Sequence, residues 1–142
     1  MCVSPDMSLP DERLTLLGQD AADLPALSAL LQDATVRVPD IGYDRRARRL
    51  AVILNRYRWE AGGGSRVRAA LRLETVTAVQ RQHWPATADA VLDLLALTQD
   101  GEFLVLTFAG GAALRARVEV IEVVLEDIDA PWATSRRPQH AV

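Results

Sequence analysis

Apolar residues near the N-terminus recur at helical spacing. Asp20 has the character of a helix N-cap, and Asp23, three residues further on, completes the pattern of a capping box. The pattern predicts a helix over residues 21–33, with its apolar face directed toward the core. That face carries Leu24, Leu27, Leu30 and Leu31.

After this helix the apolar period changes to two, which is typical of β-strands. Between positions 66 and 73 the apolar residues alternate with Arg66, Arg68 and Arg72, which predicts a half-buried strand with arginines outside. That strand is expected to end or bulge near residue 74 or 75. Other strands are predicted over residues 35–38, 50–59, 90–98, 102–108 and 112–118, with short candidates at 13–18 and 41–43.

Turn signals separate these strands. Asp100-Gly101 is a strong hairpin signal, and Gly110-Gly111 and the glycine run at 62–64 are further turns. Residues 90–98 fit a strand or a short helix, and the hairpin that follows favours the strand. Residues 119–128 fit a helix by their spacing and a strand by their β-branched residues, so both remain open.

Together these elements predict an α+β fold in which one N-terminal helix packs on a mainly antiparallel sheet of five to seven strands. The chain of 142 residues has the usual size of a single domain. We expect that domain to span residues 11–132, with residues 1–10 and 133–142 as mobile tails. Met7 is an alternative start to Met1.

Cysteine content and apolar runs bear on location. Cys2 is the only cysteine, so no internal disulfide is expected and the cytoplasm is the simplest location. No stretch approaches the roughly 20 apolar residues that a membrane helix needs.

Charge is distributed unevenly along the chain. All sixteen basic residues are arginine, and the formal net charge is −3. Residues 45–72, however, carry nine arginines against one acid, Glu60, while the segments on both sides are acidic. A basic segment of this kind is either a binding surface for anions or is neutralised by the acidic segments in the fold.

The sequence offers little catalytic chemistry. His83 and His140 lie far apart and no cysteine pair exists, so no metal site is expected. The glycines at 62–64 join two predicted strands, whereas a phosphate-binding loop joins a strand to a helix. No cofactor is expected. The enzyme alternative is a small hydrolase or isomerase that uses His83 with a carboxylate.

The strand that ends near Trp59 holds the best candidate for a contact site. Asn55, Tyr57 and Trp59 alternate with two arginines and offer residue types that are common at binding hot spots, unless the rings cap the core instead. If the predicted strands over residues 50–59 and 66–75 pair through the glycine turn, five arginines could share one face of the sheet. These are Arg56, Arg58, Arg66, Arg68 and Arg72. The candidate binding residues are Asn55, Arg56, Tyr57, Arg58, Trp59, Arg66, Arg68 and Arg72.

These features favour a non-enzymatic binding or protein-interaction domain with a protein partner that the sequence does not identify. Anion or nucleic-acid binding through residues 45–72 ranks below an acidic protein partner. Because side chains alternate along a strand, Tyr57 and Trp59 are expected on the opposite face from Arg56 and Arg58, away from the phosphates that the arginines would bind. The acidic remainder of the chain would also repel a long polyanion.

Several segments resemble the uncharacterised proteobacterial family DUF2948. The most specific is Asn-Arg-Tyr-Arg-Trp-Glu at 55–60. The similar segments are residues 31–34, 43–49, 54–60, 91–95, 125–128 and 131–132. The resemblance covers roughly residues 11–132 and implies a small bacterial protein, but it implies no activity and no catalytic residue.

Overall fold

The computed structural model describes residues 13–61 and 64–134. Their order is β1 (Thr15–Gly18), η1 (Ala21–Asp23), α1 (Leu24–Leu31), β2 (Ala34–Asp44), β3 (Arg49–Tyr57), η2 (Trp59–Ala61), β4 (Ser65–Leu73), β5 (Val76–Gln82), β6 (Val91–Asp100), β7 (Phe103–Phe108), η3 (Ala109–Gly111), β8 (Ala113–Val118), β9 (Val123–Asp127) and β10 (Trp132–Ala133), where η marks a short 3₁₀ turn.

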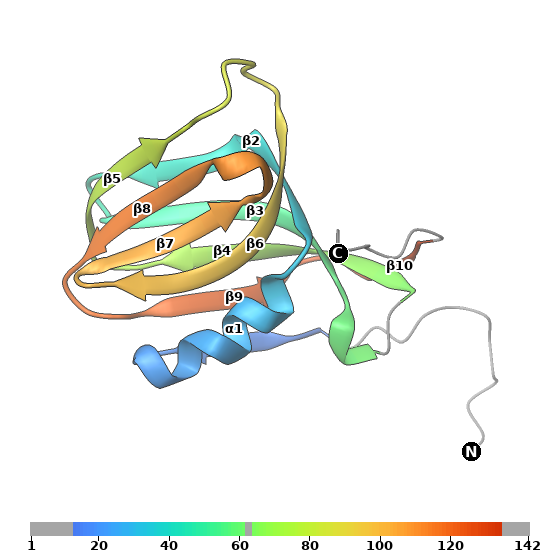
Figure 1. The fold of residues 1–142 in the computed structure, drawn as a ribbon. Coiled ribbons are helices and arrows are strands. Elements are labelled where there is room, and N and C mark those ends of the chain that lie inside the picture. The colour runs from blue at the N-terminus through green and yellow to red at the C-terminus, as the bar shows by residue number, and fades with distance from the viewer. Residues whose placement is uncertain (1–12, 62–63, 135–142) are drawn as a thin grey trace.

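The strands form one antiparallel sheet that folds over on itself. Its order is β1-β9-β4-β3-β2-β6-β7-β8-β5, and β10 pairs with β4. Figure 1 shows β5, β8, β7 and β6 lying in front of β2, β3, β4 and β9. Alternate residues of both layers are buried and form the core between them. Examples are Val52 and Leu71 in the rear layer and Leu104 and Leu106 in the front layer.

The predicted helix is present as η1 followed by α1. The capping box forms as expected, because the Asp20 carboxylate accepts a hydrogen bond from the Ala22 N–H at 2.9 Å and Asp23 accepts one from the Asp20 N–H at 3.3 Å. α1 packs mainly on β6, and it also contacts β3 and β1. Gly18 permits this close approach, since a Cβ there would lie 2.5 Å from Cδ1 of Leu27.

The prediction of a mainly antiparallel sheet with one short helix is confirmed, but the sheet is larger than the five to seven strands expected. The predicted division of this segment into two strands, over residues 35–38 and 41–43, is wrong. β2 continues to Asp44, and a register shift between Val36 and Ile41 accommodates the proline, which lacks an N–H for the ladder.

The open question at residues 119–128 is answered by β9, which pairs with β4 on one side and with β1 on the other. Of this segment, only Val123–Asp127 is a strand, and no part of it is helical. Most of the predicted tails, and two glycines of the turn at 62–64, lie outside the described residues.

Candidate functional site

The predicted five-arginine face is wrong, because β3 and β4 divide these arginines between two environments. Arg56 and Arg58 are buried, with 0% and 3% of their surfaces exposed. Arg66, Arg68 and Arg72 lie on the other face of the sheet, away from the core, where β4 alternates buried apolar residues with more exposed arginines. We call this second side the outer face.

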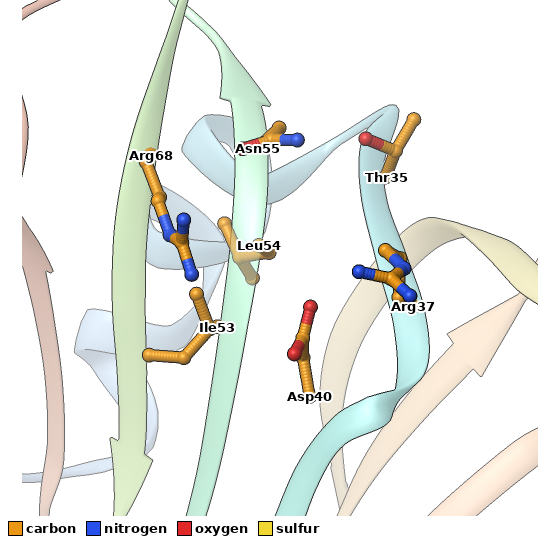
Figure 2. Close-up of a pocket in the computed structure, with 7 residues that line it drawn as sticks. All are labelled: Thr35, Arg37, Asp40, Ile53, Leu54, Asn55 and Arg68. Atoms are coloured by element: carbon orange, nitrogen blue, oxygen red, sulfur yellow. The ribbon is translucent and has the colours of Figure 1, made fainter. Parts of the chain in front are cut away.

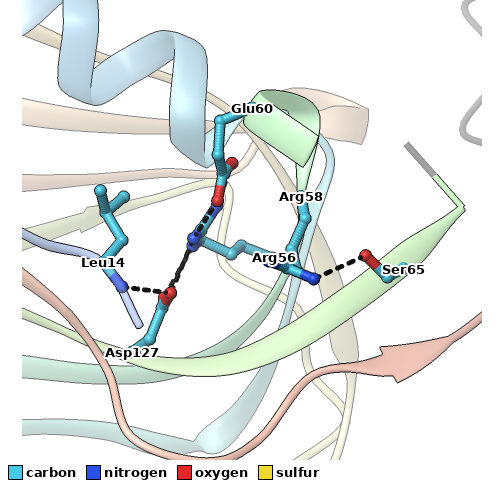
Figure 3. A network of polar contacts seen from close by, with 6 residues as sticks. All are labelled: Leu14, Arg56, Arg58, Glu60, Ser65 and Asp127. Carbon is cyan, nitrogen blue, oxygen red and sulfur yellow. Dashed lines mark hydrogen bonds and ion pairs between the residues drawn. The ribbon is translucent and has the colours of Figure 1, made fainter. Parts of the chain in front are cut away.

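Arg56 is the centre of an ionic network in which Asp127 is also buried and Glu60 is partly exposed (Figure 3). Its Nε and Nη2 donate to the two carboxylate oxygens of Asp127 at 2.9 and 2.8 Å, and Nη1 and Nη2 donate to Glu60 at 2.8 and 2.7 Å. Asp127 also accepts a hydrogen bond from the Leu14 N–H at 2.9 Å. The network therefore joins β3, η2 and β9 to the residue that precedes β1, and the Arg56 side chain is bonded within the fold.

The same contacts shift the acid–base equilibria of the network. Burial alone would lower the pKa of Arg56, but hydrogen bonds and attraction from Glu60 and Asp127 raise it well above its ordinary value. Burial would raise the pKa of Glu60, but hydrogen bonds from Arg56 and from its own backbone, with the positive charges of Arg56 and Arg58, lower it overall.

Glu60 should therefore stabilise the fold in a pH-dependent way. Its contribution is present above the unfolded pKa of about 4.3 and is lost as the pH falls through the lower folded pKa. In urea unfolding between neutral and acidic pH, Glu60→Gln should flatten the loss of stability below about pH 4.3. Glu126→Gln, at an exposed position, is the control. Equal acid sensitivity of Glu60→Gln and the wild type would contradict this assignment.

Tyr57 and Trp59 are both held by contacts within the fold. Tyr57 is 1% exposed, and its hydroxyl accepts a hydrogen bond from the Gly64 N–H at 2.7 Å. The indole N–H of half-buried Trp59 donates to the Gln32 carbonyl at 2.9 Å, and the two rings meet edge to face at 4.6 Å. Asn55, from the same predicted row of contact groups, lines a pocket.

The three arginines of the outer face differ in how they are held. Arg66 donates to the backbone carbonyls of Asp33 and Asn55 at 3.2 and 3.1 Å, so its position is determined by the fold. Arg68 and Arg72, by contrast, form no side-chain hydrogen bond or ion pair with any residue in the described ranges. Their guanidinium groups are available to a ligand.

A pocket of about 190 Å³ lies beside Arg68, at the irregular part of β2. Val36 pairs with Leu54 and Ile41 pairs with Val52, so residues 37–40 of β2 stand opposite Ile53 alone. This bulge opens the ladder and places new side chains at the opening. The pocket is lined by Thr35, Arg37, Asp40, Ile53, Leu54, Asn55 and Arg68.

Figure 2 shows Arg37 and Arg68 on two sides of this pocket, with Asp40 between them. Arg37 is exposed and, like Arg68, forms no side-chain hydrogen bond or ion pair along the described chain. Arg37 and Asp40 are not among the binding residues predicted from the sequence. The available signal was Pro39, which interrupts an otherwise alternating strand and is typical of a bulge.

His83 lies apart from this pocket. It is exposed, has a backbone φ of 49°, and its side chain makes no hydrogen bond or ion pair with the described residues. No group of three or more histidine, cysteine, aspartate or glutamate side chains within residues 13–61 and 64–134 could hold a metal ion. Over the same ranges, no helix has the length and apolar character needed to cross a membrane.

The fold and the site define a mainly antiparallel β domain with a cationic pocket on its outer face. The chain belongs to the DUF2948 family, described as a protein of unknown function, whose family model matches residues 14–140. Comparisons with curated proteins and with solved structures found no match. The family description assigns no activity.

Proposed function

We propose that this protein is a non-enzymatic binding domain that holds an acidic segment of a partner protein on its outer face. The observation that carries the proposal is a set of arginines that have no side-chain partner within the described ranges: Arg37 and Arg68 at the pocket beside the β2 bulge, and Arg72 further along β4. A guanidinium group binds a carboxylate through two parallel hydrogen bonds, which gives both attraction and orientation.

The neighbouring side chains favour a protein over a nucleic acid. Asp40 in the pocket and exposed Glu126 on β9 interrupt the positive charge, so the outer face suits separate carboxylates better than a continuous row of phosphates. Ile53 lines the pocket, and Leu17 on β1 is 49% exposed, so a mixed acidic and apolar peptide finds both kinds of contact. Tyr57 is buried and is not available to stack on bases.

The enzyme alternative rests on His83 and has less support. An exposed histidine without a carboxylate partner among the described residues lacks the orientation that general acid–base catalysis requires. We also infer a bacterial cytoplasmic location, supported by the family resemblance and by the presence of a single cysteine.

The test compares two variants of equal charge. Arg37→Gln/Arg68→Gln/Arg72→Gln removes the proposed contacts, and Arg45→Gln/Arg46→Gln/Arg117→Gln removes three arginines that line neither the pocket beside Arg68 nor the pocket beside Trp84. Each tagged protein is used as bait in nuclease-treated lysate with quantitative mass spectrometry. We expect a protein with an acidic segment whose recovery falls about tenfold or more with the first variant only.

A labelled peptide covering that acidic segment should then bind the wild type in fluorescence anisotropy, with the same dependence on the two variants. Equal recovery with both variants would overturn the proposal. Binding of a labelled single-stranded RNA at low salt, lost in the first variant, would replace it with a nucleic-acid function.

A further inference from the structure

The folded sheet leaves a seam between β2 and β5. In the strand order β5-β8-β7-β6-β2, the two end strands are not paired with each other. β6 pairs with β2 only over residues 34–37 of β2, and β8 is the one described strand that pairs with β5. At one end the seam is closed, because the Tyr43 hydroxyl donates to the Val76 carbonyl at 2.9 Å and the Val76 N–H donates to the Arg48 carbonyl at 2.8 Å. At the other end the Val38 N–H donates to the Ala90 carbonyl at 3.0 Å.

A pocket of about 290 Å³ lies in this seam, between the two closed ends. Apart from one arginine, its lining is apolar or aromatic. Trp84 meets Phe108 of the core edge to face at 6.1 Å, so the pocket adjoins the main hydrophobic core. The lining residues are Val38, Ile41, Tyr43, Leu50, Val79, Arg81, Trp84 and Leu114.

Arg81 is the charged residue of this lining. It is exposed, its guanidinium carbon lies 5.8 Å from the centroid of the Trp84 ring, and its side chain has no hydrogen bond or ion pair with the part of the chain that is described. The seam therefore combines an apolar interior with one cation at its edge. Apolar pockets with a few placed polar groups are typical small-molecule sites, and this volume is close to the lower limit of their range, which is about 300 Å³.

We propose that the seam pocket binds a small amphipathic carboxylic acid. Its apolar chain or ring lies between β2 and β5 against Ile41, Val79 and Trp84, and its carboxylate binds the Arg81 guanidinium. A carboxylate is favoured over a neutral polar head because it would pair with a cation that has no ion-pair partner among residues 13–61 and 64–134. The site is separate from the outer-face arginines and does not depend on the proposed protein partner.

The fluorescence of Trp84, which lines the seam pocket, is used to measure binding. The variant Trp59→Phe/Trp132→Phe leaves it as the sole tryptophan, and circular dichroism checks that this variant keeps the fold. Sodium decanoate, below its micelle concentration, is expected to change Trp84 fluorescence saturably. When Arg81→Gln is introduced into this single-tryptophan variant, decanoate binding should weaken about tenfold, whereas Arg45→Gln should leave it unchanged. Decanol should bind the protein with and without Arg81→Gln equally.

Val79→Phe, which fills the pocket, should abolish the change, and its fold is checked in the same way. Backbone amide NMR shifts on adding decanoate should concentrate at residues 38–43 and 76–84. The absence of saturable binding by decanoate would overturn the proposal, as would shifts confined to the outer face. Equal decanoate affinity of Arg81→Gln and Arg45→Gln would overturn the role of the arginine.

Discussion

Replacing Arg56 with alanine is expected to lower the free energy of unfolding by about 3–5 kcal/mol. The side chain is fully buried and bonded to two carboxylates, and Asp127 is buried with it. The substitution leaves the Asp127 charge inside the protein without its cation, and that uncompensated charge is the source of the loss. Urea unfolding followed by circular dichroism measures it.

Arg117→Ala is the matched control, since Arg117 pairs with Glu102 at the surface and both side chains are about half exposed. Exposed pairs contribute about 0–1 kcal/mol. Arg56→Met combined with Asp127→Leu removes both buried charges and should be less destabilising than Arg56→Ala alone, although it leaves the Leu14 N–H without its acceptor. A loss for Arg56→Ala no larger than that of the control would contradict the proposed structural role.

Leu27→Ala is expected to cost about 2–5 kcal/mol. Leu27 is 0% exposed on the core face of α1, which packs on β6 and approaches Gly18 of β1. The smaller side chain removes apolar contacts and leaves a cavity that the sheet cannot fully close. The same unfolding experiment measures the loss.

Leu17→Ala is the control, because Leu17 lies on neighbouring β1 but is 49% exposed. Its change should stay below about 1 kcal/mol, as is usual for surface positions. If the two leucine variants lost equal stability, the packing of α1 on the sheet would have to be revised.

The structure explains what most residues of the segment with the most specific family resemblance, residues 55–60, do in the fold. Within residues 55–60, Arg56 and Glu60 belong to the ionic network, and the rings of Tyr57 and Trp59 pack against each other. Asn55 alone lines the outer-face pocket. Most of this segment therefore supports the fold, and the proposed binding residues lie mainly beside it.

Short-range patterns in the sequence determined much of the local structure. The leucine spacing and the Asp20 cap predicted η1 and α1, and Asp100-Gly101 predicted the hairpin between β6 and β7. The alternation around Arg68 correctly assigned the buried and exposed sides of β4. These features depend on residues within a few positions of one another, so their causes are present in any short window of sequence.

Long-range pairing decided the rest. Arg56 and Asp127 are 71 positions apart, so no local pattern indicated that the arginine would be buried. The β2 bulge, which brings Arg37 to the same pocket as Arg68, depends on how β2 pairs with β3. Residues 119–128 fitted two local structures equally, and pairing of β9 with β4 and β1 selected the strand. Tertiary hydrogen bonds and burial supply the free energy that separates such alternatives, and they exist only once distant segments meet.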